Sequence, residues 1–319
     1  MKSLFKKVLP DPILHLWYWI TNNRDLLAPV IEKKFNVNLV QKEDFYSPLP
    51  NLEDLKANES RWLKPSALKG LNIDPQKLLI YWKELVAKYA TEYNDLPSYS
   101  DIQKKGYGVG YTKVDARTSF YMIRDIKPKK YLEIGSGLST YYASLASIAN
   151  KKNGFHETEI ICIEPYPFDN LNKIKDITIV QDFVQNVPLS VFENLNEGDV
   201  LFIDSSHAAK IDSDVYYEIL DILPSLKKGV YIHIHDIPFP YNFPYPAELY
   251  MYKKKWPQFW NEPAFVQAFL SFNDTFEIIQ SVPIIKFHFE SEVLPTIPDY
   301  NNSIDYSNAI GSLWLKKVK

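Results

Sequence analysis

The chain has 319 residues, 46% of them hydrophobic and 24% charged, so it can bury the core of one large domain with an addition. Its formal net charge of −3 provides no basic field, and no nucleic-acid partner is expected. The single cysteine, Cys162, lies in an apolar run and cannot form an intramolecular disulfide, which favours a reducing, cytoplasmic location.

Residues 1–105 are predicted to form a mainly helical extension, whose expected roles are a cap over a substrate or a contact within a homo-oligomer. Near its start, residues 13–20 are apolar but too few to span a bilayer. We expect a packed or surface-lying helix there, with peripheral contact to a membrane interface as the weaker alternative. The clearest helix covers residues 74–89, because Asp74 can cap it and Pro75 occupies its first position.

Residues 106–319 form the second predicted domain, where short apolar strands alternate with helices. Strands are expected at 130–134, 159–163, 177–180, 200–203, 230–234, 276–281 and 312–315. The sequence shows no convincing helix between the last two, so the sheet should end in a hairpin-like pair. The predicted fold is α/β: a Rossmann-like sheet of seven strands, mostly parallel with the last strand antiparallel, and helices on both faces.

A glycine turn follows the first predicted strand, in Glu133-Ile-Gly-Ser-Gly-Leu-Ser-Thr140. Gly135 and Gly137 let the backbone approach a ligand closely, and the N–H groups that begin the next helix point to the same place. A dinucleotide fingerprint would have a third glycine at Thr140, and the acid Glu133 would repel a pyrophosphate. S-adenosylmethionine (SAM) carries an ammonium and a sulfonium, so the turn favours SAM over NAD. The predicted cofactor residues here are Glu133, Gly135, Ser136, Gly137 and Ser139.

The next strand ends supply further polar groups. Glu164 ends the second strand, where an acid can accept hydrogen bonds from both ribose hydroxyls of a nucleoside; a solvated charge is the alternative. An adenine contact is expected after the third strand, from Gln185 or Asp182. Asp204 follows the fourth strand and faces the same crevice, so it is assigned to the cofactor site and to the catalytic site.

Asp204, His235 and Asp236 end neighbouring strands and should converge. Two kinds of chemistry suit them. Mg²⁺ or Mn²⁺ held by Asp204 and Asp236 would stabilise a substrate alkoxide; without a metal, His235 or His207 must take the proton directly. For His207 a surface or helix-capping role is the equal alternative, and His233 is more typical of a core histidine.

Several motifs are the basis of a family resemblance. They are Glu-Ile-Gly-Ser-Gly at 133–137, Ile-Glu-Pro-Tyr-Pro at 163–167, Phe-Ile-Asp-Ser-Ser-His at 202–207, Ile-His-Ile-His-Asp-Ile at 232–237 and Trp-Asn-Glu at 260–262, with lesser matches at 45–48, 115–116 and 122–124. Over nearly its whole length the chain resembles a bacterial family of class I SAM-dependent methyltransferases, often encoded among polysaccharide-biosynthesis genes. The resemblance implies the class I methyltransferase fold and SAM as cofactor. Related sugar and catechol enzymes hold a divalent metal with acids at these strand ends, and His235 departs from that pattern.

An acceptor is expected beside the segment 237–246, whose prolines and aromatics exclude a helix or a central strand and suit a lid or wall. The predicted substrate residues are Tyr241, Trp256, Trp260 and Arg124. For each tryptophan, a place in the core is an equal alternative. For Arg124, the equal alternative is a structural ion pair.

The function that these features predict is SAM-dependent O-methylation of a sugar or glycan hydroxyl, or of another small molecule. The predicted catalytic residues are His235, Asp236, Asp204 and His207. Two alternatives remain at this point: an NAD-dependent sugar oxidoreductase on a similar fold, and a non-catalytic binding subunit.

Overall fold

A computed structural model describes residues 15–16, 19–20, 24–39, 45–108, 110–298, 300 and 308–319. The chain divides into two compact units, residues 1–59 and 60–319. The first unit contains α3 (Arg24–Phe35) and α4 (Leu52–Ala57), and the Asn51 side chain caps α4. Most of the expected helix at 13–20 lies outside the described residues. Within the described ranges, no helix is long and apolar enough to cross a membrane.

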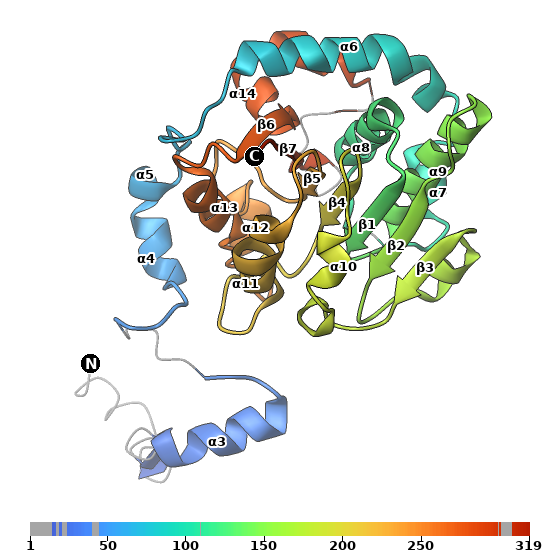
Figure 1. The fold of residues 1–319 in the computed structure, drawn as a ribbon. Coiled ribbons are helices and arrows are strands. Elements are labelled where there is room, and N and C mark those ends of the chain that lie inside the picture. The colour runs from blue at the N-terminus through green and yellow to red at the C-terminus, as the bar shows by residue number, and fades with distance from the viewer. Residues whose placement is uncertain are drawn as a thin grey trace. The chain divides into compact units, whose positions relative to one another are not determined.

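The second unit is built on one seven-stranded sheet (Figure 1). Its strands are β1 (Lys130–Ile134), β2 (Glu159–Ile163), β3 (Ile177–Val180), β4 (Val200–Ile203), β5 (Tyr231–Ile234), β6 (Phe276–Ser281) and β7 (Leu313–Lys317). They lie in the order β3-β2-β1-β4-β5-β7-β6, and β7 runs antiparallel to both β5 and β6 while the other pairs are parallel. The predicted fold class is confirmed. All four residues of β4 are buried, which explains why that strand is a continuous apolar run.

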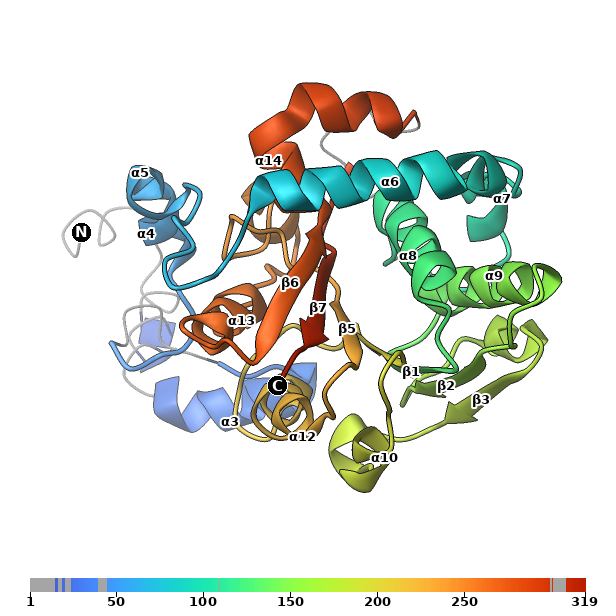
Figure 2. The ribbon, with the colours of Figure 1, turned by 45° about the horizontal axis from the view of Figure 1, so that its top comes forward.

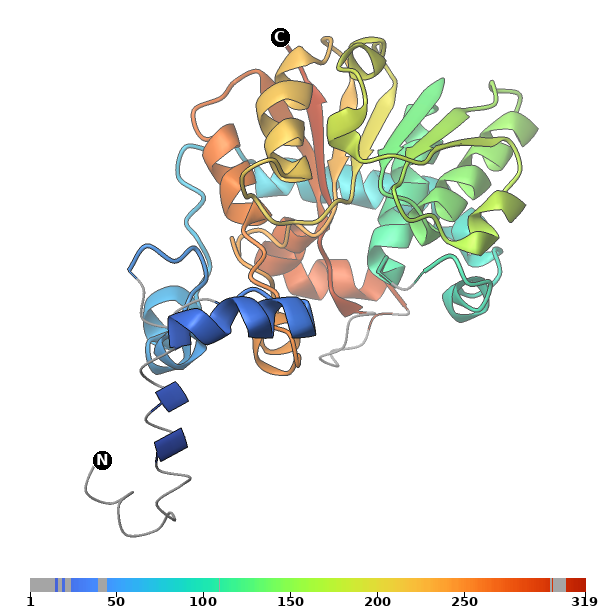
Figure 3. The same ribbon diagram turned by 90° about the horizontal axis from the view of Figure 1, so that it is seen from below.

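Helices cover both faces of the sheet (Figure 2). On one side lie α6 (Pro75–Asn94), α8 (Lys113–Ile126) and α9 (Leu138–Lys152), and on the other lie α10 (Ser190–Glu193) and α12 (Leu223–Ser225). Figure 3 shows the same arrangement, with α6 behind the strands and α12 in front. The remaining elements are α5 (Glu59–Trp62), α7 (Tyr99–Gln103), η1 (Asp169–Lys173), η2 (Val184–Asn186), α11 (Asp214–Tyr217), η3 (Glu218–Ile222), η4 (Glu248–Tyr252), α13 (Glu262–Leu270), α14 (Val282–Val293) and η5 (Leu294–Thr296).

The connection between β6 and β7 differs from the prediction, because α14 lies between them. This helix begins with Pro283 in its first turn, a position where proline is well tolerated, and a non-helical residue, Phe289, interrupts it. Its apolar residues are spread around the helix, so the sequence lacks the one-sided pattern that predicts a surface helix. The two last strands therefore pair antiparallel without forming a hairpin.

The compact unit that holds the sheet starts at Ser60, not at the expected boundary near residue 106. The cause is α6, which packs against α8, α14 and β6. Asp74 caps this helix as predicted, accepting hydrogen bonds from the N–H groups of Gln76 and Lys77. Its Trp82 is fully buried, so much of the predicted extension belongs to the core of the methyltransferase-like unit.

Candidate active site

The glycine turn joins β1 to α9 at the carboxyl edge of the sheet. Gly135 has a φ of +92° and Gly137 a φ of +142°, conformations that other residues rarely adopt. A Cβ at Gly135 would lie 2.4 Å from the carbonyl oxygen of Asp204, and one at Gly137 would lie 2.5 Å from that of Tyr107. Both positions therefore require glycine, and the turn brings the N–H groups at the start of α9 to the strand ends.

Glu133 lies beneath this turn and not at its surface. Its side chain is fully buried, and its carboxyl oxygens accept hydrogen bonds from Ser139 Oγ and, at 2.7 Å, from Thr140 Oγ1. Burial raises the pKa of Glu133 to about 8, although the hydrogen bonds from the two hydroxyls act in the opposite direction and lower it. The side chains of Glu133 and Ser139 are thus buried and bonded to each other, and a contact of either with the cofactor stays a prediction. The structure removes the charge argument for SAM over NAD, because this carboxyl is buried and protonated at neutral pH.

The pKa of Glu133 predicts how stability depends on pH. The unfolded chain loses this proton near pH 4.5 and the folded chain near pH 8, so the free energy of unfolding should fall as pH rises between these values. The slope from one such group is at most about 1.4 kcal/mol per pH unit. A Glu133→Gln variant mimics the protonated acid, so its urea-unfolding free energy should fall less between pH 5 and pH 8. Parallel curves for the two proteins would contradict the assignment.

Glu164 and Ser136 meet at the end of β2. Ser136 Oγ donates to Glu164 Oε2 at 3.3 Å, and the backbone N–H of Tyr166 donates to Oε1 at 2.8 Å. The structure therefore places these two predicted cofactor residues together beside the glycine turn. A ribose contact by Glu164 stays a prediction.

The two candidates for the adenine contact differ in what their side chains already bind. Asp182 accepts hydrogen bonds from the Phe183 N–H and from Asn186 Nδ2. Gln185 Nε2 donates to the carbonyl oxygen of Asp212, while its buried Oε1 has no hydrogen-bond partner among the described residues. A buried acceptor without a partner is suited to an amino group of a ligand, so the geometry favours Gln185.

His235 is held between two carboxylates. Its Nε2 lies 3.2 Å from Asp115 Oδ2 and its Nδ1 lies 3.2 Å from Asp204 Oδ1. Asp115 is fully buried at the start of α8 and also accepts a hydrogen bond from Ser312 Oγ at 2.6 Å. Because both ring nitrogens are bound, His235 serves as a fixed cation, and the geometry does not support it as the base that removes a substrate proton.

His207 is held in a similar way by the segment 260–262. Its Nδ1 lies 2.7 Å from Glu262 Oε2, and the Trp260 ring packs on the imidazole with centroids 4.5 Å apart. The N–H groups of Asn261 and Glu262 donate to the His207 carbonyl oxygen. This leaves Nε2 directed to Asp204 Oδ1 at 3.3 Å and Asp236 Oδ2 at 3.5 Å.

The charges of this cluster stabilise one another. Burial alone would lower the pKa of both histidines, but the surrounding carboxylates outweigh it and raise the pKa of His207 and of His235 well above the ordinary value. Against its burial, the two imidazoles hold the pKa of Asp204 below its usual range. For Asp236 burial prevails and raises the pKa. A protonated histidine has no lone pair with which to accept a proton. The carboxylate of Asp236 is therefore a better general base than either histidine.

Asp236 is also the member of the cluster that lines a cavity. It has a left-handed φ of +54° and lines a small cavity with Pro238, Tyr245 and Trp260. The structure therefore brings together all four predicted catalytic residues, His235, Asp236, Asp204 and His207, and distinguishes their roles.

Two further members of the cluster were not predicted from the sequence. Asp115 follows Thr112 with the spacing of a helix cap, and Thr112 does cap α8, so the pattern has a sufficient local explanation. Glu262 stands in the Trp-Asn-Glu motif, where only the resemblance marks it. Asp115 binds His235 and Glu262 binds His207, and each pair is far apart in the sequence. Residue spacing along the chain cannot reveal contacts of this kind.

The predicted substrate residues have four different environments. Arg124 is buried and bonded to Glu92 at 3.0 Å and to Asn150, which is the structural ion pair named as its alternative role; its contact with a ligand stays a prediction. Trp256 is 70% exposed and lines neither described cavity. Trp260 packs on His207 and borders the small cavity at Asp236. Tyr241 lines a larger cavity, which is described below.

Two comparisons of the sequence relate the chain to known proteins. Residues 132–237 match a family model described as a methyltransferase domain. An uncharacterized protein of Archaeoglobus fulgidus is 31% identical over 164 residues, which cover 48% of this chain and 72% of the relative.

Solved structures of methyltransferases are similar at lower identity. One is PaMTH1 of Podospora anserina bound to S-adenosylhomocysteine (SAH), which is 15% identical over 86% of this chain and 99% of that one, with a TM-score of 0.39. Another is an O-methyltransferase of Bacillus cereus in complex with SAH, which is 11% identical over 70% of this chain and 93% of that one, with a TM-score of 0.42. The Streptomyces achromogenes O-methyltransferase TomG, involved in tomaymycin synthesis and bound to SAM, is similar at 11% identity over 78% and 92%, with a TM-score of 0.39.

The strand order, the antiparallel β7 and the glycine turn define a class I methyltransferase fold. The chain belongs to the same family as the archaeal protein. Its own residues 132–237 match the model of a methyltransferase domain. It is a SAM-dependent methyltransferase. The NAD oxidoreductase and the non-catalytic subunit are therefore not retained as alternatives.

Proposed function

We propose that the enzyme transfers the methyl group of SAM to a hydroxyl oxygen of a sugar, a glycan or a similar small molecule. The observation that carries this proposal is the position of the Asp236 carboxylate, which lines a cavity and lies 3.5 Å from the protonated His207. The polysaccharide setting and the cytoplasmic location belong to the same proposal. They are supported by the family resemblance and by the single buried cysteine.

The reaction needs alignment and one proton acceptor. The hydroxyl oxygen attacks the methyl carbon in line with the carbon–sulfur bond, whose electron pair returns to sulfur and leaves SAH. The hydroxyl proton passes to the carboxylate of Asp236. The imidazolium of His235, fixed by Asp115 and Asp204, keeps the neighbouring carboxylates ionised.

The same cluster fits a divalent cation. One donor atom from each of Asp204, His207 and Asp236 lies within 4.8 Å of the others, and Glu262 orients the His207 ring as carboxylates commonly do for metal-bound histidines. Asp204 and Asp236 are the ligands expected from the sequence, and His207 would be a third, giving up the proton on its Nε2 when it binds the cation. Mg²⁺ or Mn²⁺ bound there would supply Lewis-acid stabilisation of the developing alkoxide.

SAH release in the presence of SAM and hydroxylated acceptors tests the proposal. A methyl glycoside with free hydroxyls should support SAH release, and the same glycoside with every hydroxyl methylated should not. Protein stripped with a chelator should lose at least about tenfold of this rate and regain it with Mn²⁺. If the blocked glycoside is equally active, the oxygen acceptor is wrong; if the chelator has no effect, the cation is wrong.

A further inference from the structure

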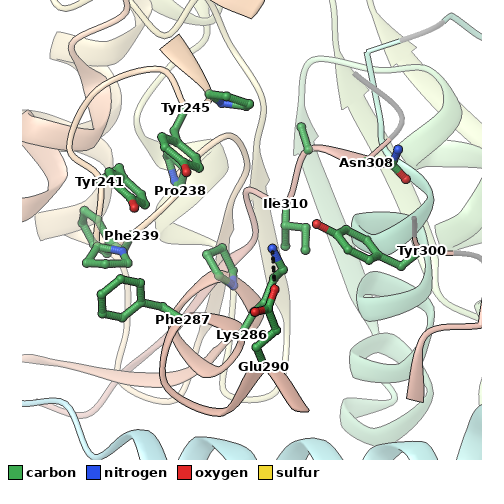
Figure 4. Close-up of a pocket in the computed structure, with 14 residues that line it drawn as sticks. Pro238, Phe239, Tyr241, Tyr245, Lys286, Phe287, Glu290, Tyr300, Asn308 and Ile310 are labelled. Atoms are coloured by element: carbon green, nitrogen blue, oxygen red, sulfur yellow. Dashed lines mark ion pairs between the residues drawn. The ribbon is translucent and has the colours of Figure 1, made fainter. Parts of the chain in front are cut away.

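A cavity of about 380 Å³ lies beside the reaction centre, between the loop after β5, the helix α14 and the segment 308–310 (Figure 4). Its volume is within the range of small-ligand pockets. Pro238, Tyr245, Ala309 and Ile310 line both this cavity and the small one that contains Asp236. The two cavities therefore share part of their walls, which places the larger one next to the cavity that contains the Asp236 carboxylate.

The segment that forms one wall of the cavity is also anchored to the reaction centre. The Gly311 carbonyl oxygen accepts a hydrogen bond from the Ile237 N–H at 2.7 Å, and Ser312 binds the same Asp115 that holds His235. A Cβ at Gly311 would lie 2.7 Å from the Cα of Asp236, so the absence of a side chain permits this close passage. The cavity wall and the catalytic cluster are thus parts of one packed arrangement.

The walls offer aromatic faces. The rings of Tyr241 and Tyr245 are stacked, with centroids 3.7 Å apart and an interplanar angle of 4°, and Phe287 stands edge-on to Tyr241. Tyr300 lies on the opposite side (Figure 4). Phe287 is 47% exposed. An accessible aromatic face of this kind suits the apolar side of a ring-shaped ligand.

The charges of the cavity are balanced. Lys286 and Glu290 are the only charged side chains among the described residues that line it, and they pair with each other at 3.6 Å. Lys286 Nζ also lies 5.0 Å from the centroid of the Tyr300 ring. The described lining of the cavity therefore offers hydrogen-bond donors and acceptors but no cation in excess of its own anion.

The described side chains of the reaction centre add no net positive charge that could compensate an anionic ligand. Its carboxylates, from Asp115, Asp204, Asp236 and Glu262, outnumber its two imidazoles, and a divalent cation would at most neutralise them. A phosphate or carboxylate on the acceptor would therefore enter without a cation to pair with and would approach other carboxylates, which is unfavourable in a partly buried site.

We propose that this cavity binds the acceptor and selects an uncharged ring compound with several hydroxyls, such as a neutral pyranoside, over one that carries a phosphate or a carboxylate. The ring packs against the Tyr241 and Phe287 side, and its hydroxyls exchange hydrogen bonds with the Lys286–Glu290 pair. This inference rests on the proposed O-methyltransferase function, but it concerns binding and can fail separately.

Binding to the full chain saturated with SAH tests the inference, by saturation-transfer NMR with two matched probes, methyl α-D-glucopyranoside and methyl α-D-glucuronide. The neutral probe should bind at least about tenfold more tightly. Tyr241→Ala and, separately, Phe287→Ala should weaken its binding by about tenfold, while the Kd for SAM and the thermal midpoint stay close to those of the parent.

A charge variant provides the sharper test. Glu290→Gln leaves Lys286 without its carboxylate, so it should move the preference by about tenfold towards the glucuronide. Glu292→Gln is the matched control, because Glu292 lies on the same helix and pairs with Lys83 at 2.6 Å but does not line the cavity; it should change nothing. A parent enzyme that prefers the glucuronide, or binds neither probe, would overturn the inference, and so would equal effects of the two variants.

The outcomes also separate the two proposals. If the neutral probe binds in this cavity but no hydroxylated acceptor releases SAH, the proposed function fails and the binding inference stands. If an acceptor is methylated at a rate that Tyr241→Ala and Phe287→Ala leave unchanged, the function stands and the cavity is not its acceptor site.

Discussion

Replacing Asp236 by asparagine should lower kcat by about three orders of magnitude and leave SAM binding intact. Asparagine keeps the size of the side chain and tolerates the left-handed φ of +54°, but it cannot accept the hydroxyl proton. The two histidines do not replace it, because the neighbouring carboxylates raise their pKa values well above the ordinary value. The effect is measured as acceptor-dependent SAH release, with SAM affinity from calorimetry.

Asp212→Asn is the control for this substitution. Asp212 also has a left-handed φ, of +60°, but lies on an exposed loop, so its replacement should leave kcat unchanged. An Asp236→Asn enzyme that retains more than about a tenth of the parent kcat would show that another group removes the proton.

Replacing His235 by leucine should cost about 3 to 5 kcal/mol of folding free energy, because it leaves the fully buried Asp115 without its cationic partner. The sequence predicted only a catalytic role for His235. The structure changes that expectation, since Asp115 and Asp204 both depend on this imidazole for charge compensation. Urea unfolding at pH 7 measures the loss.

His233→Leu provides the comparison on the same strand. His233 is equally buried, but burial and the nearby His235 lower its pKa to about 3, so it is neutral; it stacks on Trp314 and bonds Ser312 Oγ at 3.1 Å. Its loss removes about one neutral hydrogen bond, worth about 1 kcal/mol. Equal losses for the two variants would contradict the assignment of His235 as a buried imidazolium.

The parts of the fold that the sequence predicted well are those with strong local patterns. The strands at 130–134, 159–163, 177–180, 200–203 and 276–281 have the predicted bounds, because buried strands are short apolar runs that end at polar or turn residues. The sequence did not predict helix α14, because its apolar residues are spread around the helix and show no amphipathic spacing. Burial within the tertiary structure stabilises this helix.

The sequence predicted the candidate site at the ends of neighbouring strands, and the structure has these residues together at that edge of the sheet. Parallel strands bring their carboxyl ends to one edge, so Asp204, His235 and Asp236 had to meet. The sequence did not distinguish their roles. A histidine looks the same in the chain whether its nitrogens bind Asp115 and Asp204, as in His235, or Glu262 and the strand-end aspartates, as in His207.

Glu133 shows most clearly what each level of structure decides. The sequence by itself determined that an acid, two glycines and a helix start follow the first strand, and hence the fold class and the place of the cofactor. Only the tertiary structure decided that this acid points inward to Ser139 and Thr140, that Asp115 and Glu262 hold the two histidines, and that a charge-balanced cavity opens beside Asp236. Local patterns set backbone conformation over a few residues, whereas burial and charge pairing depend on groups that folding brings together from distant parts of the chain.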